Sequence, residues 1–281
     1  MTELEYIPIP FFIDNYAWLI TDRCSAIVVD PGEAAPVIQY CDENSLRLAG
    51  VMVTHHHSDH TAGIEALLAW AGDCSIPVYG PAKACIPSVS ARVGHGFRLA
   101  FKEPAFEASV IAVPGHTQDH IAYFADAHSA DGPHLFCGDT LFAGGCGRLL
   151  DGRPEQMLAS LDSLAVLPRG TQVHCAHEYT LANLQFARQC EPSNADIDAW
   201  YRRAKSLRQD GLPTLPTSIE LELAANPFLR VQSIELLCTL ESRFQISISN
   251  RLAAFTLLRG WKDIFCAEEP IPTGRLWPSL L

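Results

Sequence analysis

The residues best suited to chemistry lie in one short run near residue 55. The sequence T-H-H-H-S-D-H-T places His55, His57, Asp59 and His60 within six residues. Imidazole and carboxylate are ligands that zinc, iron and manganese accept. An apolar core has no use for so many of them, and consecutive ligands on a loop can surround two ions, whereas a helix would present one face. The run therefore predicts a two-metal site.

Three further candidate ligands lie beside turns or strand ends. They are His116 in V-P-G-H-T, Asp139 in F-C-G-D-T and His177 in C-A-H-E-Y. Each is weak alone, because a single His after a strand usually makes a structural hydrogen bond and Gly-Asp usually forms a turn. Together with the first run, they favour a metal centre over a solvated His-rich loop.

The elements that must position these ligands are short strands, and the candidate ligands follow strand ends. The expected strands cover residues 4–10, 17–21, 26–30, 50–54, 77–79, 109–113, 121–124, 134–137 and 172–175, with a helix over 34–43. From about residue 178 the pattern becomes helical. Helices are expected over residues 181–189, 195–209, 219–224, 234–243 and 250–261. We therefore predict two domains, 1–177 and 178–281.

The composition is that of a folded globular protein and excludes several classes of function. Of 281 residues, 48% are hydrophobic and 19% charged. The net charge of −12, without a basic cluster, argues against a nucleic-acid partner. There is neither a secretory leader pattern nor an apolar run long enough to span a membrane, so a cytoplasmic protein is expected. The ten cysteines include no C-x-x-C pair, which argues against a thiolate zinc site.

Longer motifs around the ligands resemble those of the glyoxalase II family, the hydroxyacylglutathione hydrolases, within the metallo-β-lactamase superfamily. The resemblance covers nearly the whole chain. Its motifs are T-H-H-H-S-D-H-T-A-G at 54–63, P-G-H-T-Q-D-H at 114–120, C-G-D-T-L-F-A-G-G-C-G-R at 137–148, A-H-E-Y-T at 176–180, N-P-F-L-R at 226–230 and R-G-W-K-D-I-F at 259–265. The first is shared across the superfamily, whereas the 137–148 block, H-E-Y-T and the tail motifs are more specific.

The resemblance implies a fold and a set of ligands. The fold would be α/β, the four-layer αββα sandwich of the metallo-β-lactamases over 1–177, followed by an all-α substrate-binding domain over 178–281. By similarity, one metal ion is held by His55, His57 and His116, the other by Asp59, His60 and His177, and Asp139 bridges them. Zinc is the expected metal, with iron and manganese as alternatives that the sequence leaves open.

Two such ions suit the hydrolysis of a thioester. Divalent ions about 3.5–4 Å apart can share a water whose pKa falls to about 7, so no separate general base is needed. Asp59 and Asp139 are therefore predicted to be catalytic through a metal-bridging hydroxide. This hydroxide would attack a carbonyl carbon while a metal stabilises the developing oxyanion. A thiolate leaves readily because its conjugate thiol has a pKa near 8.5.

By resemblance, the substrates are S-(2-hydroxyacyl)glutathiones, chiefly S-lactoylglutathione, which is cleaved to D-lactate and glutathione in methylglyoxal detoxification. The glutathione carboxylates need cationic partners. The resemblance assigns Arg148, Arg259 and Lys262 to that role and Tyr179 to a substrate contact. For the two tail cations, a solvated basic helix face is the alternative.

Two departures from the family pattern concern the substrate. Leu149 and Leu150 stand where members often carry aromatic residues, and Asp119 stands where they often carry glycine. Neither touches a predicted ligand, so they bear on glutathione affinity and acyl preference more than on catalysis. The remaining histidines are expected to be structural or to support ligands, and His120 is expected to orient a loop: His56, His95, His120, His128, His134 and His174.

Three rival functions remain. The nearest is a mononuclear-iron persulfide (sulfur) dioxygenase of the same fold, which metal content and oxygen uptake would distinguish. A metal-dependent RNA-processing nuclease would need a basic surface, which this chain lacks. A binding module with a structural metal conflicts with seven candidate ligands, since structural zinc sites close with four. The oligomeric state is not readable from the sequence, and no obligate protein partner is indicated.

Overall fold

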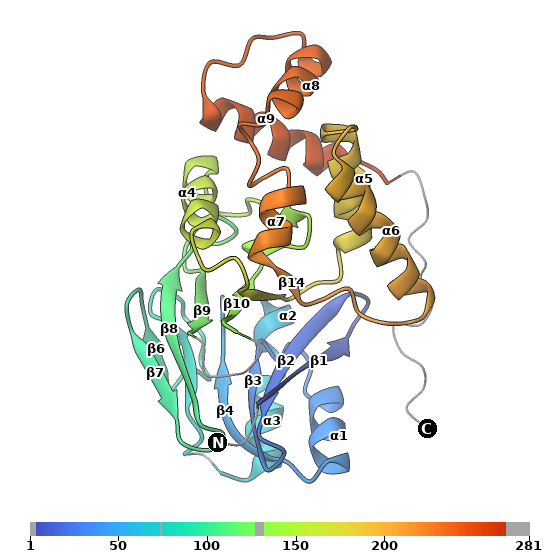
Figure 1. The fold of residues 1–281 in the computed structure, drawn as a ribbon. Helices are drawn as coiled ribbons and strands as arrows, with labels where there is room; N and C mark the ends of the chain where they lie inside the picture. The colour runs from blue at the N-terminus through green and yellow to red at the C-terminus, as the bar shows by residue number, and fades with distance from the viewer. Residues whose placement is uncertain (1–3, 74, 127–131, 268–281) are drawn as a thin grey trace.

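Two β-sheets packed face to face form the body of the protein, and helices gather around them (Figure 1). The computed structural model describes residues 4–73, 75–126 and 132–267. Each of the two large sheets has six strands. A further pair of short strands forms a small hairpin beside them.

The first sheet is built from the N-terminal third of the chain. Its strands, in spatial order, are β1 (Glu5–Phe11), β2 (Asn15–Thr21), β3 (Ser25–Val29), β4 (Arg47–Met52), β5 (Val78–Pro81) and β6 (Ala91–Val93). β1 to β3 are antiparallel, whereas β3 to β6 are parallel. β2 and β3 are buried along their whole length, because both faces of this sheet are covered.

The second sheet completes the sandwich. Its strands, in spatial order, are β14 (Thr217–Ser218), β13 (Gln172–Cys175), β10 (His134–Gly138), β9 (Ile121–Ala125), β8 (Phe106–Ala112) and β7 (Arg98–Phe101). The small hairpin pairs β11 (Leu141–Phe142) with β12 (Gly145–Cys146). β10 and β13 are parallel, so their carboxyl ends meet at one edge of the sandwich.

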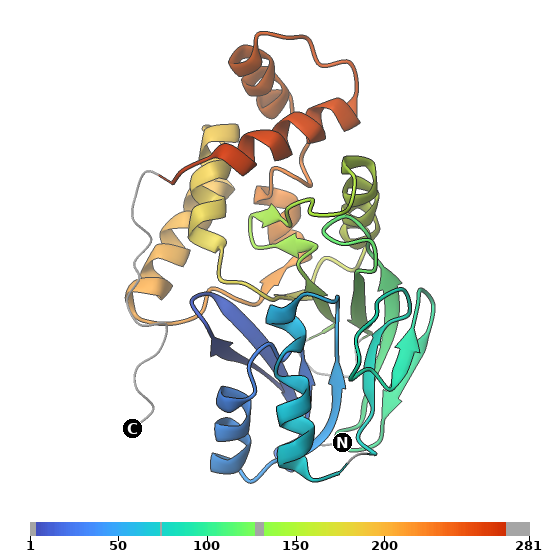
Figure 2. The same ribbon diagram turned by 180° about the vertical axis from the view of Figure 1, so that it is seen from behind.

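Helices cover the outer face of each sheet. On the first sheet lie α1 (Ala35–Glu43) and α3 (Ile64–Ala71), side by side in Figure 2, and the short α2 (Ser58–Thr61) precedes α3. Their buried residues pack into one core with the apolar residues of β2, β3 and β4. On the second sheet, α4 (Pro154–Ala165) buries Met157 and Leu161. The predicted four-layer αββα sandwich is therefore confirmed.

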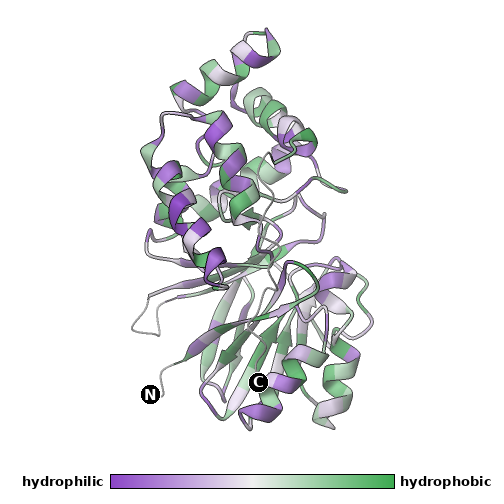
Figure 3. Cartoon of the chain, turned by 90° about the vertical axis from the view of Figure 1, so that its right-hand side faces the viewer, coloured by the Kyte–Doolittle hydropathy of each residue, from purple (hydrophilic) through white to green (hydrophobic). Residues whose placement is uncertain are grey.

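Beyond residue 178, the described part of the chain is mainly helical and lies at one end of the sandwich (Figure 1). Its helices are α5 (Thr180–Cys190), α6 (Ala195–Gln209), α7 (Ile219–Ala225), α8 (Ile234–Phe244) and α9 (Arg251–Ile264). Three begin at side-chain caps, because Asn194, Ser218 and Asn250 each accept a hydrogen bond from a backbone N–H of the first turn. Apolar and polar residues alternate around these helices (Figure 3), as expected where one face is buried.

The helical region is joined closely to the sandwich. β14 lies beyond residue 178, yet it adds an edge strand to the second sheet by pairing with β13. The buried aromatic residues Phe186, Phe228 and Trp261 belong to the same hydrophobic core as the strands of that sheet. The packing is therefore continuous across residues 177 and 178. The division into two domains at this position stays a prediction.

The expected elements agree with the structure except at some ends, but several described elements were not predicted. The strand expected over 50–54 is β4 and ends earlier, at Met52, because the Thr54 N–H donates to the Asp30 carboxylate instead of a neighbouring strand. The sequence prediction missed α2, α3, α4, β6, β7, β14 and the hairpin strands β11 and β12. Among the described helices, none is long and apolar enough to cross a bilayer.

Candidate metal centre

All seven predicted ligands meet at one edge of the sandwich. His55, Asp139 and His177 follow the carboxyl ends of β4, β10 and β13, and His116 follows β8. Three groups of donor atoms have every atom within 4.8 Å of the others: His55, His57 and His116; His55, His60 and Asp139; and Asp59, His60 and His177. The structure thus brings every predicted ligand into one cluster.

The first group consists of three imidazoles. His57 Nδ1 lies 2.9 Å from His55 Nε2 and 3.1 Å from His116 Nε2. For a tetrahedral ion with bonds of 2.0–2.1 Å, neighbouring donors lie about 3.3 Å apart. The observed separations are close to that edge length, so these three side chains fit a zinc-sized ion.

The group of Asp59, His60 and His177 combines imidazole and carboxylate. His60 Nε2 and His177 Nε2 lie 3.5 Å and 3.7 Å from Asp59 Oδ2. The same two nitrogens lie 3.5 Å and 3.3 Å from Asp139 Oδ1. Mixed nitrogen and oxygen donors at such spacing suit borderline divalent ions.

Asp139 lies between the group of His55, His57 and His116 and the group of Asp59, His60 and His177. Its Oδ1 faces His60 and His177, whereas its Oδ2 lies 3.4 Å from His116 Nε2. Asp139 Oδ1 and His60 Nε2 are buried, and neither has a hydrogen-bond partner among the residues that the structure describes. Buried polar atoms are normally satisfied, so these atoms fit a metal cation in the position that the sequence predicts.

Polar groups behind three of the histidines lie beside the ring nitrogen that points away from the cluster. His177 Nδ1 lies 3.0 Å from Asp14 Oδ1, and His60 Nδ1 lies 3.0 Å from Asp30 Oδ2. His116 Nδ1 contacts the Arg148 carbonyl at 2.8 Å. In each case the other ring nitrogen is left for the cluster, as is usual for metal-ligating histidines.

His120 positions the Asp139 backbone. Its Nε2 accepts a hydrogen bond from the Asp139 N–H at 3.1 Å. Burial, followed by the neighbouring His116, lowers the pKa of His120 to about 3, so the ring is neutral and can accept. The expectation that His120 orients a loop agrees with this contact.

The electrostatics of the cluster favour positive charge between the carboxylates. Burial alone lowers the pKa of His60, but Asp139 and Asp30 outweigh burial and hold its pKa well above the ordinary value. For His177 the same balance of burial against Asp139 raises the pKa to about 9. Burial would raise the pKa of Asp139, yet His177 and His60 keep it well below the ordinary value. The buried carboxylate is therefore ionised and attracts cations.

Residues 139–148, which we call the glycine loop, link Asp139 to Arg148. Its two ends touch, since a Cβ on Gly147 would come within 1.9 Å of the Asp139 carbonyl oxygen. The Arg148 side chain is 70% exposed and reaches into solvent beside the cluster, with Nε 3.9 Å from Asp263. Arg148 is thus available to an anionic ligand.

The other predicted substrate residues lie in the same neighbourhood with different exposure. The Tyr179 ring stacks on the His177 ring, with centroids 4.7 Å apart. Lys262 is half-buried, and its Nζ lies 3.3 Å from the Ala182 carbonyl. Arg259 is only 4% exposed and donates to the Cys146 carbonyl at 2.8 Å and to Asp263 at 3.0 Å. Arg259 therefore supports the glycine loop from behind.

The residues that depart from the family pattern flank the cluster. The Asp119 carboxylate is buried and contacts His56 Nδ1 at 2.8 Å. Leu149 is half-buried and Leu150 is 62% exposed.

The remaining described histidines lie away from the cluster of predicted ligands. A ring nitrogen of His134 lies 2.9 Å from one of His174 inside the sandwich. His95 is exposed, and His128 lies outside the described residues.

Sequence reasoning missed Asp14, Asn15 and Asp30. Asn15 Nδ2 donates to Asp59 Oδ2 at 3.1 Å, and the Asp30 carboxylate accepts from the Thr54 N–H and hydroxyl, both at 2.7 Å. The available signals were an Asp-Asn pair at the turn after the first strand and an Asp at the end of the third. Such residues are common at turns, so only their spatial position distinguishes them.

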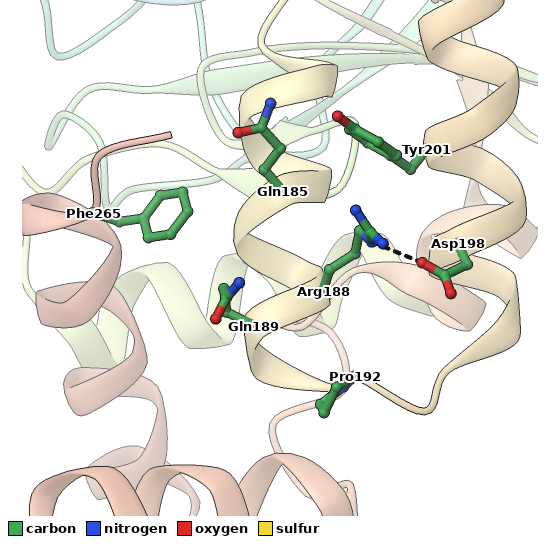
Figure 4. A pocket seen from close by; sticks show the side chains of 7 residues that line it. All are labelled: Gln185, Arg188, Gln189, Pro192, Asp198, Tyr201 and Phe265. Atoms are coloured by element: carbon green, nitrogen blue, oxygen red, sulfur yellow. Dashed lines mark hydrogen bonds and ion pairs between the residues drawn. The ribbon is translucent and has the colours of Figure 1, made fainter. Parts of the chain in front are cut away.

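A separate cavity of about 220 Å³ lies between α5 and α6 (Figure 4). Its Arg188 side chain donates to Asp198 at 2.7 Å and lies over the Tyr201 ring at 4.9 Å. None of the predicted site residues lines it. The candidate active site is therefore the cluster of predicted ligands together with the neighbouring Arg148, Tyr179 and Lys262.

The comparisons with known proteins agree with this geometry. A model of the metallo-beta-lactamase superfamily matches residues 12–177, and one of the hydroxyacylglutathione hydrolase C-terminus matches residues 178–265. The chain is 48% identical to hydroxyacylglutathione hydrolases of Cupriavidus metallidurans and Cupriavidus taiwanensis, over 93% of this chain and 99% of each relative. The crystal structure of ETHE1 from Myxococcus xanthus superposes with a TM-score of 0.58 at 24% identity, over 92% of this chain and 99% of that one, which shows the fold.

The sandwich and its clustered histidines and aspartates define a protein of the metallo-beta-lactamase superfamily with a metal-binding site. Within that superfamily, the chain belongs to the hydroxyacylglutathione hydrolase (glyoxalase II) family.

Asp14 provides a test of how the cluster is held. In Asp14→Ala, we expect the affinity for Zn²⁺ to fall about 10- to 100-fold, because His177 loses the carboxylate that orients it. Competition with a chromogenic chelator would measure this affinity. Glu65→Ala removes the same charge from an exposed position on α3 and should leave it unchanged. Equal affinity in Asp14→Ala and the wild type would show that Asp14 does not orient His177.

Proposed function

We propose that this protein hydrolyses S-(2-hydroxyacyl)glutathiones, chiefly S-lactoylglutathione, to D-lactate and glutathione. The observation that carries the proposal is the pair of donor groups joined by Asp139 in a chain that matches hydroxyacylglutathione hydrolases over nearly its whole length. Such a reaction would serve methylglyoxal detoxification.

The two donor groups would hold one divalent ion each. His55, His57 and His116 would bind the first, Asp59, His60 and His177 the second, and Asp139 would give one carboxylate oxygen to each. Zinc is the proposed metal, with iron and manganese compatible with the same ligands. When bound, two such ions supply Lewis-acid polarisation of a carbonyl and generate hydroxide from water near neutral pH.

The protein's own residues would orient the thioester over this cluster. The exposed Arg148 guanidinium offers a bidentate partner for a glutathione carboxylate. The Tyr179 ring, stacked on His177, would contact the peptide part of glutathione and exclude water from the His177 ring. Arg259 would act on the substrate indirectly, since its donors already hold the glycine loop and Asp263.

Lys262 would supply a second cation. Among the described residues, no carboxylate oxygen lies within 4.0 Å of its Nζ, and Arg148 and Arg259 lie near enough to disfavour its charge. A substrate carboxylate would relieve that repulsion. A thiolate can leave without receiving a proton. The cations Arg148 and Lys262 beside the predicted ligands would suit such an anionic leaving group.

The reaction itself is tested by thiol release. We expect the purified protein to liberate free thiol from S-lactoylglutathione, to lose this activity after treatment with a chelator, and to regain it with Zn²⁺, Fe²⁺ or Mn²⁺. Oxygen uptake with glutathione persulfide provides the control for the rival dioxygenase. Oxygen consumption without thiol release from the thioester would contradict the proposal.

Lys262 makes the proposal testable through pH. Burial and the neighbouring Arg259 lower the pKa of Lys262 to about 8 in the free protein. The ammonium is present below that pH and lost above it, so kcat/KM for S-lactoylglutathione should fall as pH rises through about 8, through a rise in KM.

The matched variants are Lys262→Arg and Lys262→Gln. The arginine keeps its charge and should move the decline to higher pH, whereas the glutamine should lower kcat/KM at pH 7 about tenfold and flatten the profile. A decline above pH 8 that persists unchanged in Lys262→Gln would assign it to another group.

A further inference from the structure

Side chains of the helical region donate hydrogen bonds to most of the backbone carbonyls in the middle of the glycine loop. The contacts are Asn226 Nδ2 to the carbonyls of Phe142 (3.2 Å) and Gly145 (2.9 Å), Asn183 Nδ2 to Ala143 (3.0 Å), and Arg259 Nη1 to Cys146 (2.8 Å) and Gly147 (3.4 Å). The loop is short and begins at Asp139. Its position is therefore imposed from outside the sandwich.

Glu222 is the hydrogen-bond acceptor in this set of contacts. It lies on α7, is fully buried, and its Oε2 accepts from the Gly144 N–H at 3.0 Å and from Asn226 Nδ2 at 2.8 Å. Its Oε1 accepts from the Thr217 hydroxyl at 2.7 Å. Burial raises the pKa of Glu222 to about 7, although the three hydrogen-bond donors that converge on it favour the carboxylate form. Glu222 thus links the middle of the loop to Asn226, which holds two of its carbonyls.

The loop leaves little freedom to adjust if these contacts are lost. Gly144 has a φ of +67°, a conformation that glycine adopts without strain. A Cβ on Gly145 would come within 2.6 Å of Asn183 Nδ2, so the backbone lies directly against α5. At the ends of the loop, Gly147 touches the Asp139 carbonyl and the Arg148 carbonyl contacts His116 Nδ1 at 2.8 Å. A shift of the middle of the loop would therefore reach two predicted ligands.

We propose that Glu222, together with Asn226, is a positioning residue that sets the place of the Asp139 carboxylate between the two donor groups. The helical region then contributes to metal binding as well as to substrate binding. This inference rests on the metal-bridging role proposed for Asp139. It concerns residues that do not themselves touch the metal or the substrate.

The test compares Glu222→Leu with Glu222→Gln in the full-length protein. The leucine removes the acceptor for Gly144 and Asn226, whereas the glutamine can keep its oxygen there, because the Thr217 hydroxyl can turn to accept from the new amide. At pH 8, we expect Glu222→Leu to lower Zn²⁺ affinity about 10- to 100-fold, measured by chelator competition on the apoprotein. With saturating metal, kcat should fall about tenfold while KM changes less than about threefold. Glu222→Gln should stay within about threefold of the wild type in all three quantities.

Thr217→Val is the matched control. It removes a hydrogen bond to the same buried carboxylate without touching the loop, so it should lower thermal stability but leave metal affinity and kcat unchanged. Should Glu222→Leu fail to fold, Asn226→Ala removes the donor to Phe142 and Gly145 and carries the same expectation.

Several outcomes would overturn the inference. Metal affinity and kcat within twofold of the wild type in Glu222→Leu, or in Asn226→Ala, would show that the loop keeps its place without these residues. Equal loss in Thr217→Val would show general loosening, and equal loss in Glu222→Gln would show that the acceptor is not what matters. A wild type that binds Zn²⁺ but releases no thiol would contradict the proposed function, while the affinities would still decide the role of Glu222.

Discussion

The structure depends on bringing an ionised carboxylate, Asp139, into a buried position between two groups of imidazoles. A buried carboxylate without a counter-charge is destabilising by several kcal/mol. Here its two oxygens face His60 and His177 on one side and His116 on the other. The site therefore favours positive charge, and that preference supports the proposal that it binds a pair of divalent cations.

The sandwich brings together ligands from distant parts of the chain. The ligands His55, His116, Asp139 and His177 follow strands, and the run that begins at His55 continues into α2, which carries Asp59 and His60. The donor atoms of all these residues come together at one edge of the sandwich. The loops there are held by polar residues that no ligand motif contains. Asp30 fixes the Thr54 backbone and faces His60, while Asp14 and Asn15 reach across from the β1–β2 turn to His177 and Asp59.

The candidate ligands can be recognised in the sequence because their chemistry is local and unusual, and the structure brings them together. Four ligands in six residues need no tertiary information to be noticed, and the buried strands are recognisable from their apolar runs. The supporting residues are different. Asp14, Asp30, Glu222 and Asn226 are common residue types at turns and on helices, and their partners lie between 4 and 163 positions away in the sequence. The inward orientation of Arg259 was likewise not predictable, since a basic residue on a helix is usually exposed.

The account is tested most directly by anomalous diffraction from crystals of the metal-loaded protein. It predicts two metal peaks about 3.5–4 Å apart, one beside His55, His57 and His116 and the other beside Asp59, His60 and His177, with Asp139 between them. A single peak in fully active protein, or metal bound away from Asp139, would contradict it.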